Sequence, residues 1–412
     1  MASAPDRLQS LDTVRGVAVM GILLLNIVGF GMPEAAYFNP RAYGGSEGAD
    51  LAVWIVNFIL FDGKMRGLFS FLFGASLLLV VERAEAKSEN PLQVHASRMA
   101  WLLVFGLAHL WLLWFGDILG LYALLGMVAY FFRGMRSSRM VVLGAMLVLA
   151  QALVFASLPF GAYYLQTVAP DSPGYANAAK QLAALNDSFG IPTAAETARQ
   201  LALFRGGYAQ ILADRFAHNS LGPLPMALLF GPETLAYMLF GMAALRSGFL
   251  RGEWSRARVR KLLWLGFGVG LPAYAAIAVY LINSDFSLFS VLLGVMPLTA
   301  PVRPFLFLGW ACLILLLARG GPLNARIAAA GRMAFTNYLT TSLICTTLFY
   351  GYGLGWFGYL SRAELYLVVA GVWALILLWS KPWLARFQYG PLEWVWRSLS
   401  RGRAQPMRRG AD

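Results

Sequence analysis

The sequence predicts an all-α membrane protein, a polytopic bundle of about ten transmembrane helices, and three observations lead to this fold class. Hydrophobic residues make up 59% of the 412 residues and charged residues only 13%, whereas charged residues are about 25% of a soluble domain. Stretches without Asp, Glu, Lys or Arg recur along the chain and approach the roughly 20 residues that a membrane-spanning helix needs. Their uninterrupted apolar character excludes the alternating pattern of barrel strands.

Ten segments are expected to span the membrane, each defined by such an apolar stretch. They lie near 14–32, 65–82, 99–115, 117–132, 140–160, 224–245, 262–282, 303–319, 333–350 and 364–380. If the N-terminus is cytoplasmic, the inner segments hold 24 of the 33 basic residues. The positive-inside rule therefore predicts that both termini are cytoplasmic. This bias accounts for the net charge of +13, so the expected partner is the lipid bilayer and not nucleic acid.

Three further segments organise the chain. The sequence Asp62-Gly63-Lys64-Met65-Arg66 interrupts the apolar stretch 51–81, which predicts an interfacial segment over 51–61 and a spanning helix over 67–81. A full span over 286–302 would invert the basic tail, so a re-entrant or interfacial segment is expected there. An outer loop over 161–221, with a helix-like stretch over 194–214, separates an N-terminal membrane unit, 1–160, from a C-terminal unit, 222–412.

Polar residues near the first span are functional candidates, because a polar group at membrane depth needs a protein partner. Asp12 and Arg15 flank the inner end of this span, and Asn26 lies three turns deeper. His109 is the only histidine within a predicted span, and it is either an interhelical hydrogen-bonding group or a general base. Asp117 follows eight residues later, about 12 Å along a continuous helix, so direct contact between the two side chains is not expected.

The remaining polar groups can be interpreted as structural or as functional. Asp62, Lys64 and Arg66 either snorkel and pair with one another or hold an anionic substrate. Glu233 follows Gly231 and Pro232, which favours a capping role at a helix start. Arg332 and Asn337 border or lie in a late span, where interhelical bonding is the default. Two cysteines within spans, Cys312 and Cys345, are expected to be buried and unpaired, and no metal-ligand pattern is present in the sequence.

Several motifs, in order along nearly the whole chain, resemble the YeiB-like family of bacterial inner-membrane proteins. The motifs are Leu11–Gly16 with Gly21–Ile27, then Gly63–Gly74, Gly106–His109 with Gly116–Leu119 and Tyr122–Ala123, and finally Gly331–Tyr338, Ser342–Cys345 and Tyr389–Trp394. The last three are similar to the C-terminal domain of unknown function 418 of that family. The resemblance implies a multi-pass protein of the bacterial inner membrane.

The opening Asp12-x-x-Arg15-Gly16 is also similar to a wider group of membrane acyltransferases. One branch has a catalytic histidine at the position of Asn26, and another has asparagine there and a histidine in the next outer loop, where this chain has none. The similarity implies a cytoplasmic acyl-CoA donor held by Arg15, a proton handled by His109 or Asp12, and a carbonyl oriented by Asn26. The other candidate binding residues are Asp62, Lys64, Arg66, Asp117, Arg332 and Asn337.

Two other functions fit the same residues. A transporter or flippase of a small or lipidic substrate would use these polar groups to line a path. A non-catalytic scaffold of the cell envelope would use them only to hold its helices together. None of the three functions calls for a resident cofactor or metal ion, since acyl-CoA would be a substrate.

Overall fold

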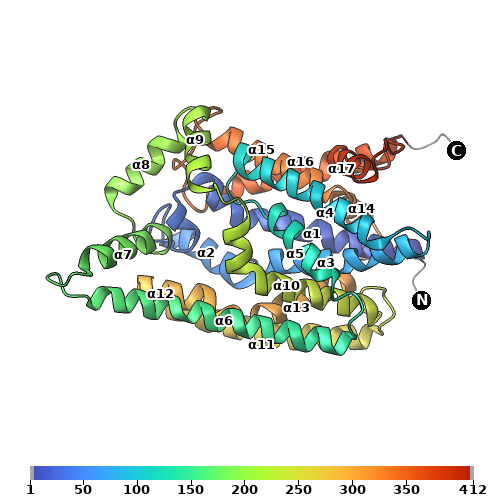
Figure 1. Cartoon of the computed structure of the whole chain (residues 1–412), viewed down its shortest axis with the longest axis horizontal. Helices are drawn as coiled ribbons and strands as arrows, with labels where there is room; N and C mark the ends of the chain where they lie inside the picture. Colours follow the sequence, from blue (N-terminus) through green and yellow to red (C-terminus); the bar gives the residue numbers. More distant parts are fainter. Residues whose placement is uncertain (1–3, 319, 409–412) are drawn as a thin grey trace.

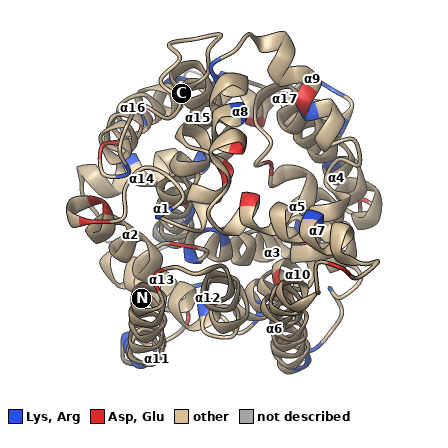
Figure 2. Cartoon of the chain, turned by 90° about the vertical axis from the view of Figure 1, so that its left-hand side faces the viewer, with Lys and Arg blue, Asp and Glu red and all other residues tan. Residues whose placement is uncertain are grey.

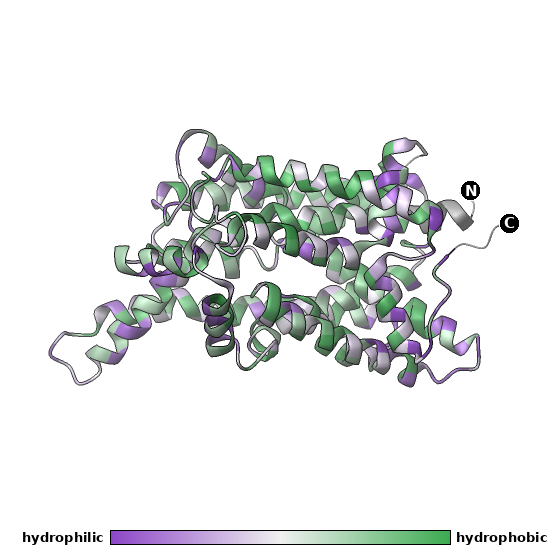
Figure 3. Ribbon diagram, turned by 90° about the horizontal axis from the view of Figure 1, so that it is seen from above, coloured by the Kyte–Doolittle hydropathy of each residue, from purple (hydrophilic) through white to green (hydrophobic). Residues whose placement is uncertain are grey.

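The computed structural model describes residues 4–318 and 320–408, and this part of the chain is a helical bundle that contains no β-strand. Its one β feature is an isolated bridge between Phe387 and Arg408. The long helices run along a common axis, and the two ends of the chain lie at the same end of the bundle (Figure 1). Hydrophilic residues gather toward the ends of the bundle and hydrophobic residues cover its middle (Figure 3), as a bilayer requires.

Each of the ten predicted spans falls on a helix. Seven helices of the described residues are long and apolar enough to cross a membrane, or eight if a bent pair is one span. The spans predicted over 117–132 and 333–350 are helices of only 12 and 16 residues, because irregular segments at 114–118 and 350–364 take up part of each apolar stretch. The helices are α1 Ala4–Gly31, α3 Lys64–Glu85, α4 Pro91–Ala108, α5 Leu119–Tyr130, α6 Ser137–Thr167, α10 Leu224–Arg246, α11 Arg256–Asn283, α13 Arg303–Leu317, α15 Ala334–Phe349 and α16 Leu365–Arg386.

A turn at 61–63 and a bend before α13 are both present, although helix α2, Gly48–Leu60, and α3 together form one apolar stretch of 38 residues, Gly48–Glu85, so an interfacial position of 51–61 stays a prediction. Helix α2 ends before α3 begins, and Gly63 between them has a left-handed φ of +68°. A Cβ atom at Gly63 would overlap the Arg303 side chain, so this turn requires glycine. The segment before α13 consists of α12, Leu288–Leu293, and a π-helix, Gly294–Leu298, and it meets α13 at 56°. It therefore forms no straight span of its own.

The outer region contains more helix than predicted. Helix α6 continues to Thr167, and α7, Tyr175–Phe189, α8, Ala194–Phe204, and α9, Tyr208–His218, follow. The prediction of one helical stretch over 194–214 was wrong, because the pair Gly206-Gly207 separates α8 from α9 and glycine is a poor helix former. Figure 1 shows these three helices at the end of the bundle opposite the termini.

Two shorter helices close the end that holds the termini. Helix α14, Pro322–Arg332, packs closely on α1: a Cβ atom at Gly16 would overlap the Ile327 carbonyl, and one at Gly331 would overlap the Asp12 carbonyl. Small residues at such crossings let membrane helices approach. Helix α17, Pro391–Arg401, joins α4 through a hydrogen bond of 3.0 Å from Trp396 Nε1 to the Arg98 carbonyl. Cys312 and Cys345 are buried and free, as expected.

The orientation can be measured with reporter fusions. Fusions after Asp285 and after Gly358 should report an outer location, and fusions after Arg251 and Arg401 a cytoplasmic one, because basic residues concentrate at the inner end. A cytoplasmic signal after Asp285 would contradict the predicted orientation of α11 and of the bent segment that follows it.

Candidate functional site

His109, Asp117 and Ser342 form a chain of hydrogen bonds inside the bundle. His109 Nδ1 lies 2.9 Å from Asp117 Oδ1, and His109 Nε2 lies 2.9 Å from Ser342 Oγ. The second Asp117 oxygen accepts a bond of 2.7 Å from the backbone N–H of Gly120. A hydroxyl, an imidazole and an orienting carboxylate in this order are the arrangement that activates a nucleophile. We refer to these three residues as the triad.

A break in the α4 helix brings the first two members together. The five residues His109–Leu113 form a π-helix, and Trp114 is extended with φ −155° and ψ 134°. The chain therefore turns back before α5 starts, and Asp117 returns to the level of His109. The expectation that these side chains do not touch was wrong, because it assumed a continuous helix. π-Helical turns inside α-helices are frequent at functional sites.

Ser342 was not predicted as a functional residue, and in the sequence it stands out only as part of a family motif. It lies on α15, 233 residues away from His109 in the chain, so no local spacing links them. One turn earlier on the same helix, the Tyr338 ring lies 5.1 Å from the His109 ring, and its hydroxyl donates 3.3 Å to the Gly116 carbonyl. The recurrence of polar residues every fourth position on α15 is the one signal that could have indicated this face.

The triad is enclosed, and an unpartnered indole N–H belongs to a ring beside it. His109 and Ser342 are each 1% exposed. Within the described residues, the buried Trp114 Nε1 has no hydrogen-bond partner, and the Trp114 ring lies 6.4 Å from the His109 ring and stacks on Phe30. Asn26, one turn before Phe30 on α1, is half-buried and its amide forms no hydrogen bond to the described part of the chain. These two groups could therefore donate to a bound molecule.

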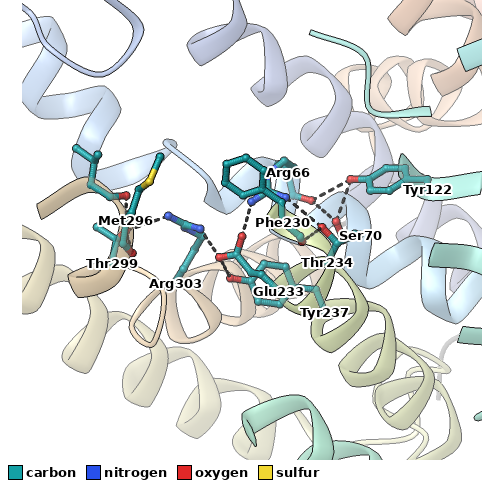
Figure 4. A network of polar contacts seen from close by, with 11 residues as sticks. Arg66, Ser70, Tyr122, Phe230, Glu233, Thr234, Tyr237, Met296, Thr299 and Arg303 are labelled. Carbon is teal, nitrogen blue, oxygen red and sulfur yellow. Dashed lines mark hydrogen bonds and ion pairs between the residues drawn. The ribbon is translucent and has the colours of Figure 1, made fainter. Parts of the chain in front are cut away.

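A second cluster surrounds the carboxylate of Glu233, which is completely buried (Figure 4). It accepts hydrogen bonds from Arg66 Nη2 at 2.5 Å, from the Tyr237 hydroxyl at 2.6 Å and from Arg303 Nη1. Arg303 Nη2 also donates 2.9 Å to Thr299 Oγ1. A buried carboxylate between two guanidinium groups is neutralised by both, which is the condition for retaining charge away from water.

Glu233 does not begin a helix, and that prediction was wrong. Helix α10 starts nine residues earlier, at Leu224, and contains Pro232 in its interior. Proline at a helix start and proline inside a membrane helix look alike in sequence, because membrane helices tolerate interior proline when neighbours satisfy the freed backbone groups.

The residues of the 62–66 turn do not pair with one another. Arg66 binds Glu233, and Lys64 is fully buried, with its ammonium 3.2 Å from the centre of the Tyr274 ring and bonded to the Phe58 carbonyl. Asp62 is half-buried and forms no ion pair within the described part of the chain, although it interacts electrostatically with Lys64. Mutual pairing at the surface is therefore replaced by separate contacts inside the bundle.

Helix α5 connects the triad to the Glu233 cluster. Asp117 lies just before α5 and Gly120 in its first turn. The hydroxyl of Tyr122 on the same helix is 2.9 Å from Ser70 Oγ, whose other contact is the Arg66 carbonyl at 3.0 Å. Tyr338 beside the triad interacts electrostatically with Asp117 and Tyr122. The two clusters therefore form one polar layer, which we call the outer layer.

Asp12, Arg15 and Arg332 lie in a separate inner layer, and Asn337 lies between helices without joining the triad. Arg15 Nη1 is 2.9 Å from Asp12 Oδ1, and Arg15 Nη2 is 3.4 Å from Ser76 Oγ. Arg332 is exposed, and Asn337 donates to the Ala330 carbonyl and the Ser380 hydroxyl between helices. Eleven residues separate Arg15 from Asn26, about 16 Å along α1. The predicted residues therefore do not form one site.

Comparisons with known proteins relate the chain to proteins without a described activity. Residues 244–403 match the family described as "Protein of unknown function (DUF418)". The chain is 33% identical to the "Uncharacterized protein YeiB" of Escherichia coli strain K12 over 97% of this chain and 98% of that protein. It is 30% identical to the "Uncharacterized protein YxaH" of Bacillus subtilis strain 168 over 98% of this chain and 96% of that protein. No solved structure matches.

The Glu233 cluster can be tested by stability. Glu233→Gln should lower the unfolding free energy by about 3–5 kcal/mol, because it leaves two buried guanidinium groups without their carboxylate. The measurement is thermal or denaturant unfolding of the purified protein in detergent. Glu253→Gln is the matched control, since Glu253 is exposed and outside the spans, and it should leave stability unchanged. Equal stability of the two variants would show that the buried ion pairs do not stabilise the bundle.

Proposed function

The chain belongs to the YeiB-like family of multi-pass membrane proteins, and we propose that it is a membrane-embedded enzyme that transfers an acyl group at the triad. The observation that carries the proposal is the pair of 2.9 Å hydrogen bonds that places His109 between Asp117 and Ser342. An enclosed, dry environment strengthens such electrostatic contacts. The proposed location is the bacterial inner membrane.

The proposed reaction has two halves. In the first, Ser342 Oγ attacks the carbonyl carbon of an acyl thioester, and His109 Nε2 takes the hydroxyl proton while Asp117 stabilises the imidazolium. The C–S bond breaks, and the departing thiolate takes that proton. In the second half, His109 deprotonates an acceptor hydroxyl, which attacks the acyl-serine ester, and Ser342 regains its proton. Trp114 Nε1, an unpartnered donor beside the triad, is assigned to the oxyanion, and the amide of Asn26, one turn before the Phe30 ring that stacks on Trp114, is the candidate second donor.

The inner layer suits a donor that enters from the cytoplasm. Arg15 is half-buried, with Asp12 as its counter-ion, and the exposed guanidinium of Arg332 interacts electrostatically with Asp12. Guanidinium groups bind phosphate oxygens in a planar, two-point geometry, so we assign them to the phosphates of acyl-CoA. The acyl end would then extend from Arg15 toward the outer layer, where the triad lies.

Transport of an anionic substrate is a second candidate, and a specific observation favours it. The Arg66 side chain is 23% exposed although it lies at the start of a spanning helix, and Asp62 nearby has no ion-pair partner within the described residues. Ionisable groups that line a path through a membrane have this combination of partial exposure and depth. A transporter would use the outer layer without turning over acyl-CoA.

The triad is tested by single variants. Ser342→Ala, His109→Gln and Asp117→Asn should each lower the rate of CoA release from acetyl-CoA by a factor of about 10²–10⁴, the usual contribution of acid–base catalysis. His95→Gln is the matched control, because His95 is equally buried on α4 but its Nε2 lies 3.0 Å from the Gly126 carbonyl and near no carboxylate. The assay follows thiol release by the purified protein.

Three results would decide the outcome. Loss of turnover in the triad variants but not in His95→Gln supports acyl transfer. Full activity in Ser342→Ala would remove the acyl-serine step. No acyl-CoA turnover by the wild type, together with anion uptake into vesicles that Arg66→Gln abolishes, would favour the transporter.

The proposed contact of Arg15 with acyl-CoA is tested by measuring KM and kcat separately. Arg15→Gln should raise the KM for acyl-CoA with little change in kcat, because the contact is made equally in the ground state and the transition state. The double variant Asp12→Asn/Arg15→Gln should keep the raised KM, since removal of the unpaired carboxylate restores charge balance but not the phosphate contact. An unchanged KM would show that Arg15 does not bind acyl-CoA and acts only as a cytoplasmic positive charge that sets the orientation of the first helix.

A further inference from the structure

A groove of about 650 Å³ lies at the side of the bundle that carries α6 and α11. In Figure 2 these two helices stand as separate columns at the lower edge, with α12 between them and α10 above α6. Residues of α3, α10 and α13 complete the lining. Its volume falls within the range of about 300–1,000 Å³ that is typical of ligand sites. Representative lining residues are Val141, Ala145, Leu149, Phe240, Leu262 and Phe305.

The groove is apolar along its length and polar at one end. Within the described residues, the only polar side chains that line it are three serines and Trp254, whose indole carries one N–H group. All three lie where α6 begins and α10 ends, and this is the end of the bundle where the positive-inside rule places the cytoplasm. The three residues are Ser137, Ser138 and Ser247.

The polar end is surrounded by positive charge. The two segments that form it, 131–142 and 244–262, carry nine basic residues and one acid, Glu253, and one of the nine, Arg251, is paired with Glu82 of α3. The Arg258 guanidinium lies 3.6 Å from the centre of the Trp254 ring, which itself lines the groove. The basic residues are Arg133, Arg136, Arg139, Arg246, Arg251, Arg256, Arg258, Arg260 and Lys261.

The length of the groove matches one leaflet of a bilayer. Its lining on α6 runs from Ser137 to Leu149, which is about 18 Å along a helix. Half of a hydrocarbon core about 30 Å thick is about 15 Å. An acyl chain that starts at the inner interface would therefore end at the far end of the groove. The lining residue Ala145 and its neighbour Met146, which is not part of the lining, are both exposed.

We propose that this groove binds an anionic phospholipid of the inner leaflet, with one acyl chain along α6 and the phosphate among the arginines. The apolar lining accounts for the chain, and the excess of basic residues at the polar end, eight of them outside the Arg251–Glu82 ion pair, accounts for the selection of a negatively charged headgroup. The site is separate from the triad, so it does not depend on the proposed acyl transfer.

The experiment uses Trp254 as a reporter within the full chain. The protein is reconstituted into phosphatidylcholine vesicles, and a small fraction of the lipid is replaced by phosphatidylglycerol or phosphatidylcholine with brominated acyl chains, which quench tryptophan on contact. The difference between the wild type and Trp254→Phe isolates the Trp254 emission. Half-maximal quenching should need at least about fivefold less brominated phosphatidylglycerol than phosphatidylcholine, as expected for one favourable charge contact.

Two variants on one helix provide the control. Ala145→Phe fills the groove and should abolish the preference for phosphatidylglycerol. Met146→Phe adds the same ring on the next residue, outside the lining, and should keep the preference. Equal quenching by the two lipids would reduce the contact to ordinary boundary lipid, and absence of quenching would show that no acyl chain enters; either result overturns the proposal.

Discussion

The carboxylate of Glu233 is the constraint around which the bundle is arranged. It is fully buried, and it is bonded to a guanidinium from α3 and to another from α13. Transfer of an unpaired charge away from water is costly, so none of the three helices can move away without leaving a charge uncompensated. The cluster therefore holds α3, α10 and α13 in one mutual arrangement, which apolar packing alone would leave less specific.

The helix surfaces around this cluster are shaped for close approach. A Cβ atom at Gly74 would overlap the Met238 carbonyl, and one at Gly241 would overlap the Phe71 carbonyl, so α3 and α10 pack almost backbone to backbone. In a bundle surrounded by lipid, such van der Waals packing replaces the hydrophobic driving force of a soluble core. The same α3 surface carries Ser70, whose contact with Tyr122 sets the position of α5. Asp117 lies two residues before α5 and accepts a hydrogen bond from Gly120 in its first turn, so the charge cluster and the triad are positioned by one continuous set of contacts.

The two polar layers divide the interior along the membrane normal. The inner layer, with Asp12 and Arg15, is partly exposed toward the basic end, whereas the triad of the outer layer is enclosed. For the acyl transfer that we propose, an exposed binding group and a dry reaction centre would serve opposite needs, because a donor must be captured from water and a developing charge is best stabilised where water is excluded. The separation supports a substrate that bridges the layers more than one that binds in either alone.

The helical class, the positions of the spanning helices, the break at 61–63 and the family could all be predicted from the residues in chain order. These properties follow from the transfer of apolar stretches into lipid and from the need of every backbone group for a partner, and both are local. Which polar groups meet depends instead on the tertiary fold, as for Glu233 with Arg303 and for His109 with Ser342. A spanning helix is apolar on all sides, so its sequence has no amphipathic period to show which side faces a neighbour. The π-helical break after Ala108, which brings Asp117 back to His109, is a product of packing and left no pattern that the spacing of residues could reveal.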